Sequence, residues 1–204
     1  MRIIVLFALT VMLFVIPTAN AQDATGHWGI QGDVARVSVP KSIVEKINAL
    51  PEKPDISGIT YSGGVVRFNK KGAPSYALQY SSLRASIEGI QQQGQFQRHI
   101  SGGGSMRGFM ATKYLNFVTR KWVSGGLAFG GGVGELKAHY VRSFIAPGNI
   151  SFGAAKQYGH VVPFFEILAR VDFRPMRHVT VGPFYGIHNG TLTAGVALRI
   201  HTIK

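Results

Sequence analysis

Alternation of apolar and polar residues along positions 160–201 limits the folds open to this chain more than any other feature. Between residues 160 and 173 every second side chain is apolar, and the positions between them include Glu166, Arg170 and Asp172. Side chains alternate between the two faces of a β-strand, so this period of two predicts a strand with one apolar and one polar face. The pattern returns at 179–188 and 191–201 around Asn189-Gly190, a dipeptide typical of a two-residue β-hairpin.

The first 21 residues have the features of a secretory signal peptide. Arg2 supplies a positive charge, residues 3–16 form an apolar run, and Ala19-Asn20-Ala21 matches a cleavage signal. An apolar run of this length is too short to cross a bilayer as a helix. We therefore expect a signal peptide at 1–21 and a single domain at 22–204.

Composition narrows the class of the exported domain. The chain has no cysteine, so disulfides cannot stabilise it outside the cytoplasm. No run of roughly eighteen apolar residues follows the signal peptide, so residence in a membrane requires a closed β-barrel. The formal net charge of +13 favours anionic lipid phosphates over nucleic acid as the partner of an exported protein.

The rest of the chain repeats the strand pattern. Strands are predicted at 26–39, 57–68, 75–88, 105–118 and 123–140, with a β-bulge near Val34 in the first and a change of apolar parity within the third. Long connections at 40–56, 89–104 and 141–159 alternate with short ones, as in barrels with long outer loops and tight periplasmic turns. The predicted fold is all-β, an eight-stranded antiparallel up-and-down transmembrane β-barrel in the cell outer membrane.

The chain resembles the small outer-membrane β-barrel superfamily, the OmpA/OmpX-like eight-stranded barrels. The resemblance rests on the alternation of long and short connections between strands, the Ala19-Asn20-Ala21 signal and the alternating C-terminal run. The resemblance spans roughly residues 26–200 and implies a monomer inserted by the barrel-assembly machinery. Members usually end on an aromatic residue that this machinery reads, whereas this chain ends Ile200-His201-Thr202-Ile203-Lys204. Pro163 and Pro183 each remove a ladder donor, so we expect them at bulges or strand ends.

Charged residues on the polar face of the predicted strands are candidates for an ion-pair network inside the barrel. An eight-stranded barrel is only wide enough for its own side chains, and buried charges need partners of opposite sign. A narrow or gated channel is the alternative interpretation. The predicted lumen network consists of Asp33, Arg36, Arg84, Glu88, Glu166, Arg170, Asp172 and Arg199.

Basic residues in the three long loops are candidates for contact with the phosphates of outer-membrane lipid and lipopolysaccharide. Lysine and arginine form charge-assisted hydrogen bonds to phosphate oxygens. The predicted contact set is Lys41, Lys46, Lys53, Arg98, Arg142 and Lys156.

No catalytic, cofactor-binding or metal-binding residue is predicted, and we expect a non-enzymatic structural or interaction role. The seven histidines have no spacing typical of metal ligands. His99-Ile100-Ser101 invites comparison with the lipid A 3-O-deacylases, which use a histidine, a nearby serine and a glutamate, but no acid follows in the next strand. Two alternatives stay open: a lipid A-modifying enzyme on the same barrel, and a soluble periplasmic lipocalin-like barrel that binds a small apolar ligand with its apolar parity inward.

Overall fold

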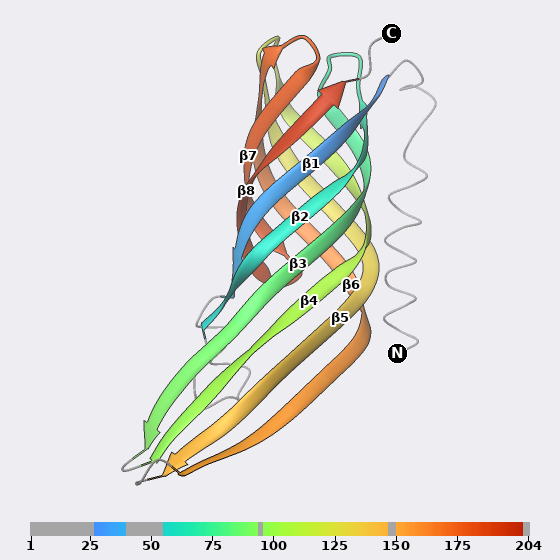
Figure 1. Ribbon diagram of the computed structural model, residues 1–204. Coiled ribbons are helices and arrows are strands. Elements are labelled where there is room, and N and C mark those ends of the chain that lie inside the picture. The colour runs from blue at the N-terminus through green and yellow to red at the C-terminus, as the bar shows by residue number, and fades with distance from the viewer. Residues whose placement is uncertain (1–26, 40–54, 94–95, 147–149, 202–204) are drawn as a thin grey trace.

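The chain folds into a closed ring of eight antiparallel strands (Figure 1). A computed structural model describes residues 27–39, 55–93, 96–146 and 150–201, so the predicted signal peptide lies outside the described residues. The strands are β1 (His27–Ser38), β2 (Asp55–Phe68), β3 (Pro74–Gln93), β4 (Phe96–Thr119), β5 (Val123–Ala146), β6 (Ile150–Met176), β7 (Val179–His188) and β8 (Thr191–His201). Each strand pairs with its sequence neighbour, and β8 pairs with β1 to close the ring. The predicted eight-stranded up-and-down barrel is confirmed.

The distribution of side chains is that of a barrel with an apolar outside. On β6, Phe165 and Val171 point outward and are 47% and 42% exposed, whereas Glu166 and Arg170 point inward and are each 4% exposed. The lipocalin-like alternative required this apolar parity to point inward, so it is wrong. In the described ranges, no helix has the length and apolar character needed to cross a membrane.

Tight turns connect the strands at the end of the ring where β1 begins and β8 ends. Between β2 and β3, the side chain of Asn69 accepts hydrogen bonds from the backbone N–H groups of Lys71 and Ala73, both at 3.0 Å. At the opposite end, Asn189 and Gly190 have φ values of 53° and 78°. Positive φ at both positions is the geometry of a type I′ hairpin, so the prediction for this dipeptide is confirmed.

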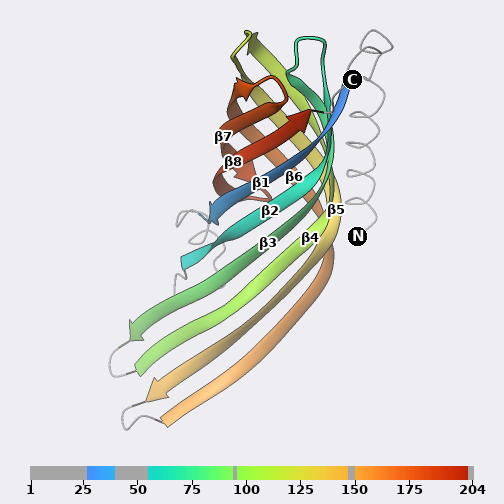
Figure 2. The same ribbon diagram turned by 45° about the horizontal axis from the view of Figure 1, so that its top comes forward.

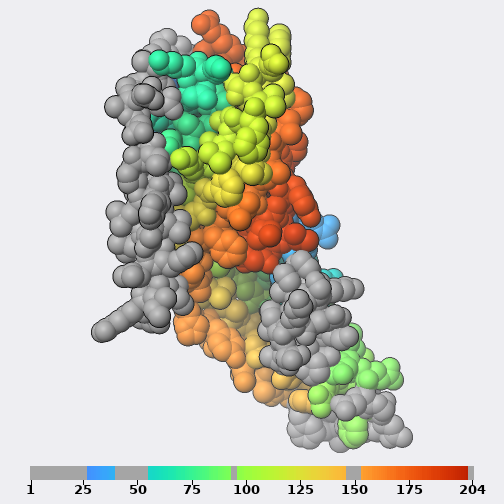
Figure 3. Space-filling model, turned by 180° about the vertical axis from the view of Figure 1, so that it is seen from behind, coloured from blue at the N-terminus to red at the C-terminus, as the bar shows by residue number. Residues whose placement is uncertain are grey.

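Four strands continue well past the ring. β3 to β6 contain 20, 24, 24 and 27 residues, compared with 12 in β1 and 10 in β7. Their outer parts form a distal sheet, which comprises residues 89–93, 96–102, 139–146 and 150–160 (Figures 1 and 2). The space-filling view from behind shows this sheet projecting from the ring (Figure 3).

The distal sheet corrects the prediction of long loops at 89–104 and 141–159. Pairing between β4 and β5 runs without interruption from Gln97 opposite Ile145 through the glycines at 102–104. The neighbouring strands hold these residues in the ladder whatever their side chains. Since this part of the sheet lies beyond the closed ring, neither face has to be uniformly apolar, and the period of two disappears from the sequence.

The changes of apolar parity in the first and third strands do not come from a bulge, which was the cause predicted for the first. β1 pairs with β2 residue by residue through Val34, with no bulge. The register shifts lie near the turns instead, at 67/68, 116/118 and 173/176. The apolar residues beyond the supposed shifts point into the lumen, where an apolar cap consists of Val37, Leu83, Met106, Met110 and Phe164.

Both prolines lie where the pairing of β6 with β7 is interrupted or has not begun. Pro163 precedes Glu166, the first residue of β6 that pairs with β7. Pro183 lies in the gap between the Arg170–Phe184 pair and the Phe173–Val181 pair. Neither position therefore requires a donor toward that neighbour. The expectation of bulges or strand ends was wrong, because both prolines lie inside their strands.

Candidate functional site

Asp172 of β6 is at the centre of a buried ion-pair group in the lumen. Arg199 of β8 donates to it with Nη1 2.6 Å from Oδ1, and Arg170 forms an ion pair with the same carboxylate. The three residues are 1%, 4% and 4% exposed. The ring centroid of Tyr114 lies 4.7 Å from Cζ of Arg170 and 5.3 Å from Cζ of Arg199. One shared carboxylate and one aromatic face therefore hold two like charges together.

Two glutamines extend this group across the lumen. Gln31 Oε1 accepts hydrogen bonds from the Tyr114 hydroxyl at 3.1 Å and from Arg199 Nε at 3.2 Å. Gln31 Nε2 donates to Gln79 Oε1 at 2.6 Å, and Gln79 Nε2 donates to Thr112 Oγ1 at 3.3 Å. Side chains from β1, β3, β4 and β8 are thus joined through the interior as well as through the backbone ladders.

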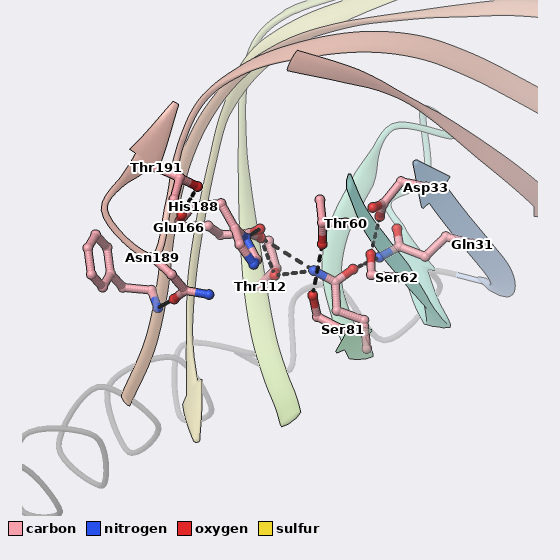
Figure 4. Close-up of polar contacts among 12 residues, drawn as sticks. Gln31, Asp33, Thr60, Ser62, Ser81, Thr112, Glu166, His188, Asn189 and Thr191 are labelled. Atoms are coloured by element: carbon pink, nitrogen blue, oxygen red, sulfur yellow. Dashed lines mark hydrogen bonds and ion pairs between the residues drawn. The ribbon is translucent and has the colours of Figure 1, made fainter. Parts of the chain in front are cut away.

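Glu166 belongs to a second polar group, nearer the hairpin at 189–190 (Figure 4). The Thr112 hydroxyl donates to Glu166 Oε1 at 2.7 Å, and His188 Nδ1 lies 3.4 Å from Oε2. A Cβ at Gly130, opposite Glu166 on β5, would lie 2.6 Å from Glu166 Cγ, so the glycine provides the space for this side chain. On the other side of the lumen, the Ser62 hydroxyl donates to Asp33.

Ring and apolar side chains close the lumen on both sides of the polar groups. At the turn end, His201 hydrogen-bonds to His27 and to Thr180, both at 2.9 Å, and the ring of Phe68 stacks on it at 3.7 Å. The apolar cap fills the other end. The cavity left among the polar groups is about 30 Å³, enough for about one water molecule. This interior is a filled core rather than an aqueous pore, which argues against the channel interpretation.

The structure separates the predicted lumen residues into two sets. Inside the ring it places Asp33, Glu166, Arg170, Asp172 and Arg199. The prediction was wrong for Arg36, Arg84 and Glu88, which lie on the outer face because β1 and β3 keep a constant parity. The sequence prediction missed the neutral members Gln31, Gln79, Thr112, Tyr114 and His188, whose inward parity was the available signal.

A second candidate region is the inner face of the distal sheet, which continues the lumen side of the barrel. Arg98 of β4, Arg142 of β5 and Lys156 of β6 share this face, since their register partners are Phe144, Ile100 and Tyr140. The guanidinium of Arg98 lies 5.3 Å from the centroid of the Phe144 ring. The rings of Tyr140 and Tyr158 stack at 6.0 Å with their hydroxyls 3.4 Å apart. Among the described residues, this face carries no acid.

This placement changes the predicted set of lipid-phosphate contacts. Arg98, Arg142 and Lys156 belong to strands rather than loops, and they face the inner side, away from any membrane around the barrel. The other three members, Lys41, Lys46 and Lys53, lie outside the described residues.

The histidine and serine compared with lipid A deacylases lie on the outer face of β4. Ser101 pairs with Glu88 of β3, an acid that the sequence comparison did not consider. Within the described ranges, no hydrogen bond connects His99 with Ser101 or Glu88, and no three His, Asp or Glu side chains are arranged to hold a metal ion. Nucleophilic catalysis requires the base within hydrogen-bond reach of the serine.

No family model and no curated protein matches the chain. Among solved structures, the chain is 14% identical to Ail, the attachment invasion locus protein of Yersinia pestis, with a TM-score of 0.42, over 86% of this chain and 97% of that one. A second structure of Ail, in complex with the heparin analogue sucrose octasulfate, matches with a TM-score of 0.37. Neisserial surface protein A matches at 11% identity and a TM-score of 0.35, over 86% of this chain and 97% of that one. None of these likenesses assigns a ligand or a role to a residue of this chain.

Proposed function

We propose that this chain is a non-enzymatic outer-membrane β-barrel that holds a basic sheet outside the membrane for an anionic partner. The single observation that carries the proposal is the combination of an apolar wall around a filled polar lumen with a distal sheet that continues from it. Such a wall suits the hydrocarbon layer, and a filled lumen suits an anchor better than a channel. The proposal includes export by the segment at 1–21, insertion by the barrel-assembly machinery, and a monomeric state.

The partner is an anionic molecule that approaches from outside the cell. Arg98, Arg142 and Lys156 come from three adjacent strands and lie on the inner face, which the lipid around the barrel does not reach. Phosphate, sulfate or carboxylate groups would form charge-assisted hydrogen bonds with these cations. The rings of Phe144, Tyr140 and Tyr158 lie among them, as in surfaces that bind sugars or peptides through polar groups and flat rings.

Substitution of the three inner-face cations tests this proposal. We expect R98Q/R142Q/K156Q to bind a polyanion such as sucrose octasulfate on the order of 100-fold more weakly than the unsubstituted barrel, since three solvent-accessible ion pairs are lost and each contributes up to about 1 kcal/mol. Isothermal titration calorimetry on the detergent-folded protein at two salt concentrations gives the affinity and its salt dependence. Electrophoretic mobility before and after heating verifies the fold of each variant.

The matched control is K70Q/K71Q/R120Q, which removes the same charge from exposed turn residues at the other end of the ring. Equal loss of affinity in both triple variants would show that net charge alone attracts the polyanion. Unchanged affinity of the inner-face variant would exclude this face as the binding surface.

The enzyme alternative has one specific observation in its favour, the pairing of Ser101 with Glu88 two residues from His99. Ser101 is eight residues along β4 from Phe109, an exposed aromatic residue of the apolar wall, which is roughly 26 Å measured along the tilted strand and places Ser101 away from lipid esters. We expect the purified protein to leave the acyl chains of lipid A intact and H99A to behave identically, as measured by mass spectrometry of the lipid. Loss of an acyl chain with the natural protein but not with H99A would establish the enzyme.

A further inference from the structure

Three arginines on the outer face of the barrel lie close together. Arg36 of β1 and Arg84 of β3 are both register partners of Ile59 on the strand between them, so about 10 Å separates their backbones. Arg107 of β4 pairs with Ser82 and is therefore a diagonal neighbour of Arg84, with about 7 to 8 Å between backbones. All three side chains are exposed. We call this group the wall arginines.

The wall arginines mark the row at which the outer surface changes character. On the turn side of them, the outward residues Tyr61, Tyr80 and Phe109 are 53%, 43% and 59% exposed, and the last two rings contact at 5.2 Å. In the next outward row on the other side, the described residues are polar or glycine: Ser38, Ser57, Ser86, Gly103, His139 and Gln157. Aromatic residues followed by cations are typical of a membrane interface, where lipid phosphates lie.

Among the described residues, no carboxylate forms an ion pair with a wall arginine. The acid that pairs in register with Arg107 is Glu135, and its carboxylate contacts Lys137 at 3.0 Å. A shallow depression beside Arg36 is lined partly by the apolar side chains of Ile59 and Val196, which suits an acyl chain.

We propose that the wall arginines bind the phosphate groups of a bisphosphorylated glycolipid, such as lipid A, in the leaflet on the distal side of the membrane. Each guanidinium offers a planar fork of donors that matches phosphate oxygens, and arginines with one strand between them can engage phosphates at opposite ends of one headgroup. The inference rests on the proposed membrane location and adds a specific lipid site on the outer wall. This site is separate from the inner-face cations of the distal sheet, which lie on β4, β5 and β6 and point to the opposite face.

The test uses the full barrel in nanodiscs of phosphatidylcholine that contain lipid A, monophosphoryl lipid A or neither. We expect native mass spectrometry to show lipid A retained on the protein, and retention to fall by on the order of 100-fold in R36Q/R84Q/R107Q, since each basic residue near an anionic lipid surface contributes roughly fivefold. Monophosphoryl lipid A should be retained less than lipid A. Each single arginine variant should show an intermediate loss.

The turn variant K70Q/K71Q/R120Q is again the control, and it should retain lipid A like the natural protein. Equal retention by the wall variant, or equal loss in both variants, would overturn the proposal. Equal retention of monophosphoryl lipid A and lipid A would show that a second phosphate is not recognised, and this too would overturn it. A barrel that fails to insert into any nanodisc would contradict the proposed function itself, and heat-modifiable mobility identifies that outcome before lipid is measured.

Discussion

D172N is expected to lose about 3 to 5 kcal/mol of unfolding free energy, the usual cost of removing one partner from a buried ion pair. The substitution keeps the size of the side chain but leaves Arg170 and Arg199 as two buried like charges with no counter-ion between them. Tyr114 would remain as a weaker partner for both cations. Urea unfolding of the barrel in lipid vesicles, followed by tryptophan fluorescence, measures the change.

A matched control for this substitution is available at the start of β2. Asp55 is exposed, so D55N makes the same chemical change and should alter stability by no more than about 0.5 kcal/mol. A triple variant that replaces Asp172, Arg170 and Arg199 with apolar residues should recover most of the lost stability, because the cost comes from unpaired charge rather than from lost volume. Unfolding of D172N at the same urea concentration as the natural protein would contradict the role given to the network.

The sequence predicted the strands best where one face belongs to the apolar outer wall and the other to the polar lumen. The run that contains Phe165 and Val171 on one parity and Glu166 and Arg170 on the other shows this, because the two environments impose opposite residue types. The Asn189-Gly190 hairpin was equally clear, since few dipeptides adopt positive φ twice in succession.

The prediction failed where the environments on the two faces change. At the distal end of the ring the apolar cap places Val37 and Leu83 inside, while Arg36 and Arg84 lie outside at the boundary of the wall. A rule that puts apolar residues outside therefore assigned the wrong face to these arginines. In the distal sheet neither face has a uniform environment, so the residues at 89–104 carried no period from which a strand could be predicted.

The contacts across the lumen could not have been predicted from any single strand. Gln31, Gln79 and Glu166 belong to β1, β3 and β6, and a chain of hydrogen bonds joins them through the interior. Alternation shows that each side chain points inward. Which side chains meet depends on the stagger between strands when the ring closes, and no local sequence pattern records that stagger.

V171R should nearly abolish assembly into the membrane. Val171 is 42% exposed on the outer face of β6, within the apolar wall, and an arginine near the bilayer midplane of a barrel costs about 2 to 4 kcal/mol. We expect little protein in the outer-membrane fraction and loss of the heat-modifiable band on gels. F165R should have a smaller effect, because the backbone N–H of Phe165 bonds to Asn189 in the outer hairpin, near the edge of the wall.

An arginine substitution at Gln157, on the same strand as Val171, is the comparison that shows where the membrane ends along β6. It has the same outward parity as Val171 but lies in the distal sheet, opposite His139. Q157R should therefore assemble as well as the natural protein, since its added charge remains in water. The effects should decrease in the order V171R, F165R, Q157R. If all three variants assembled equally well, the outer face of β6 would not be in contact with lipid, and the membrane barrel would have to be abandoned.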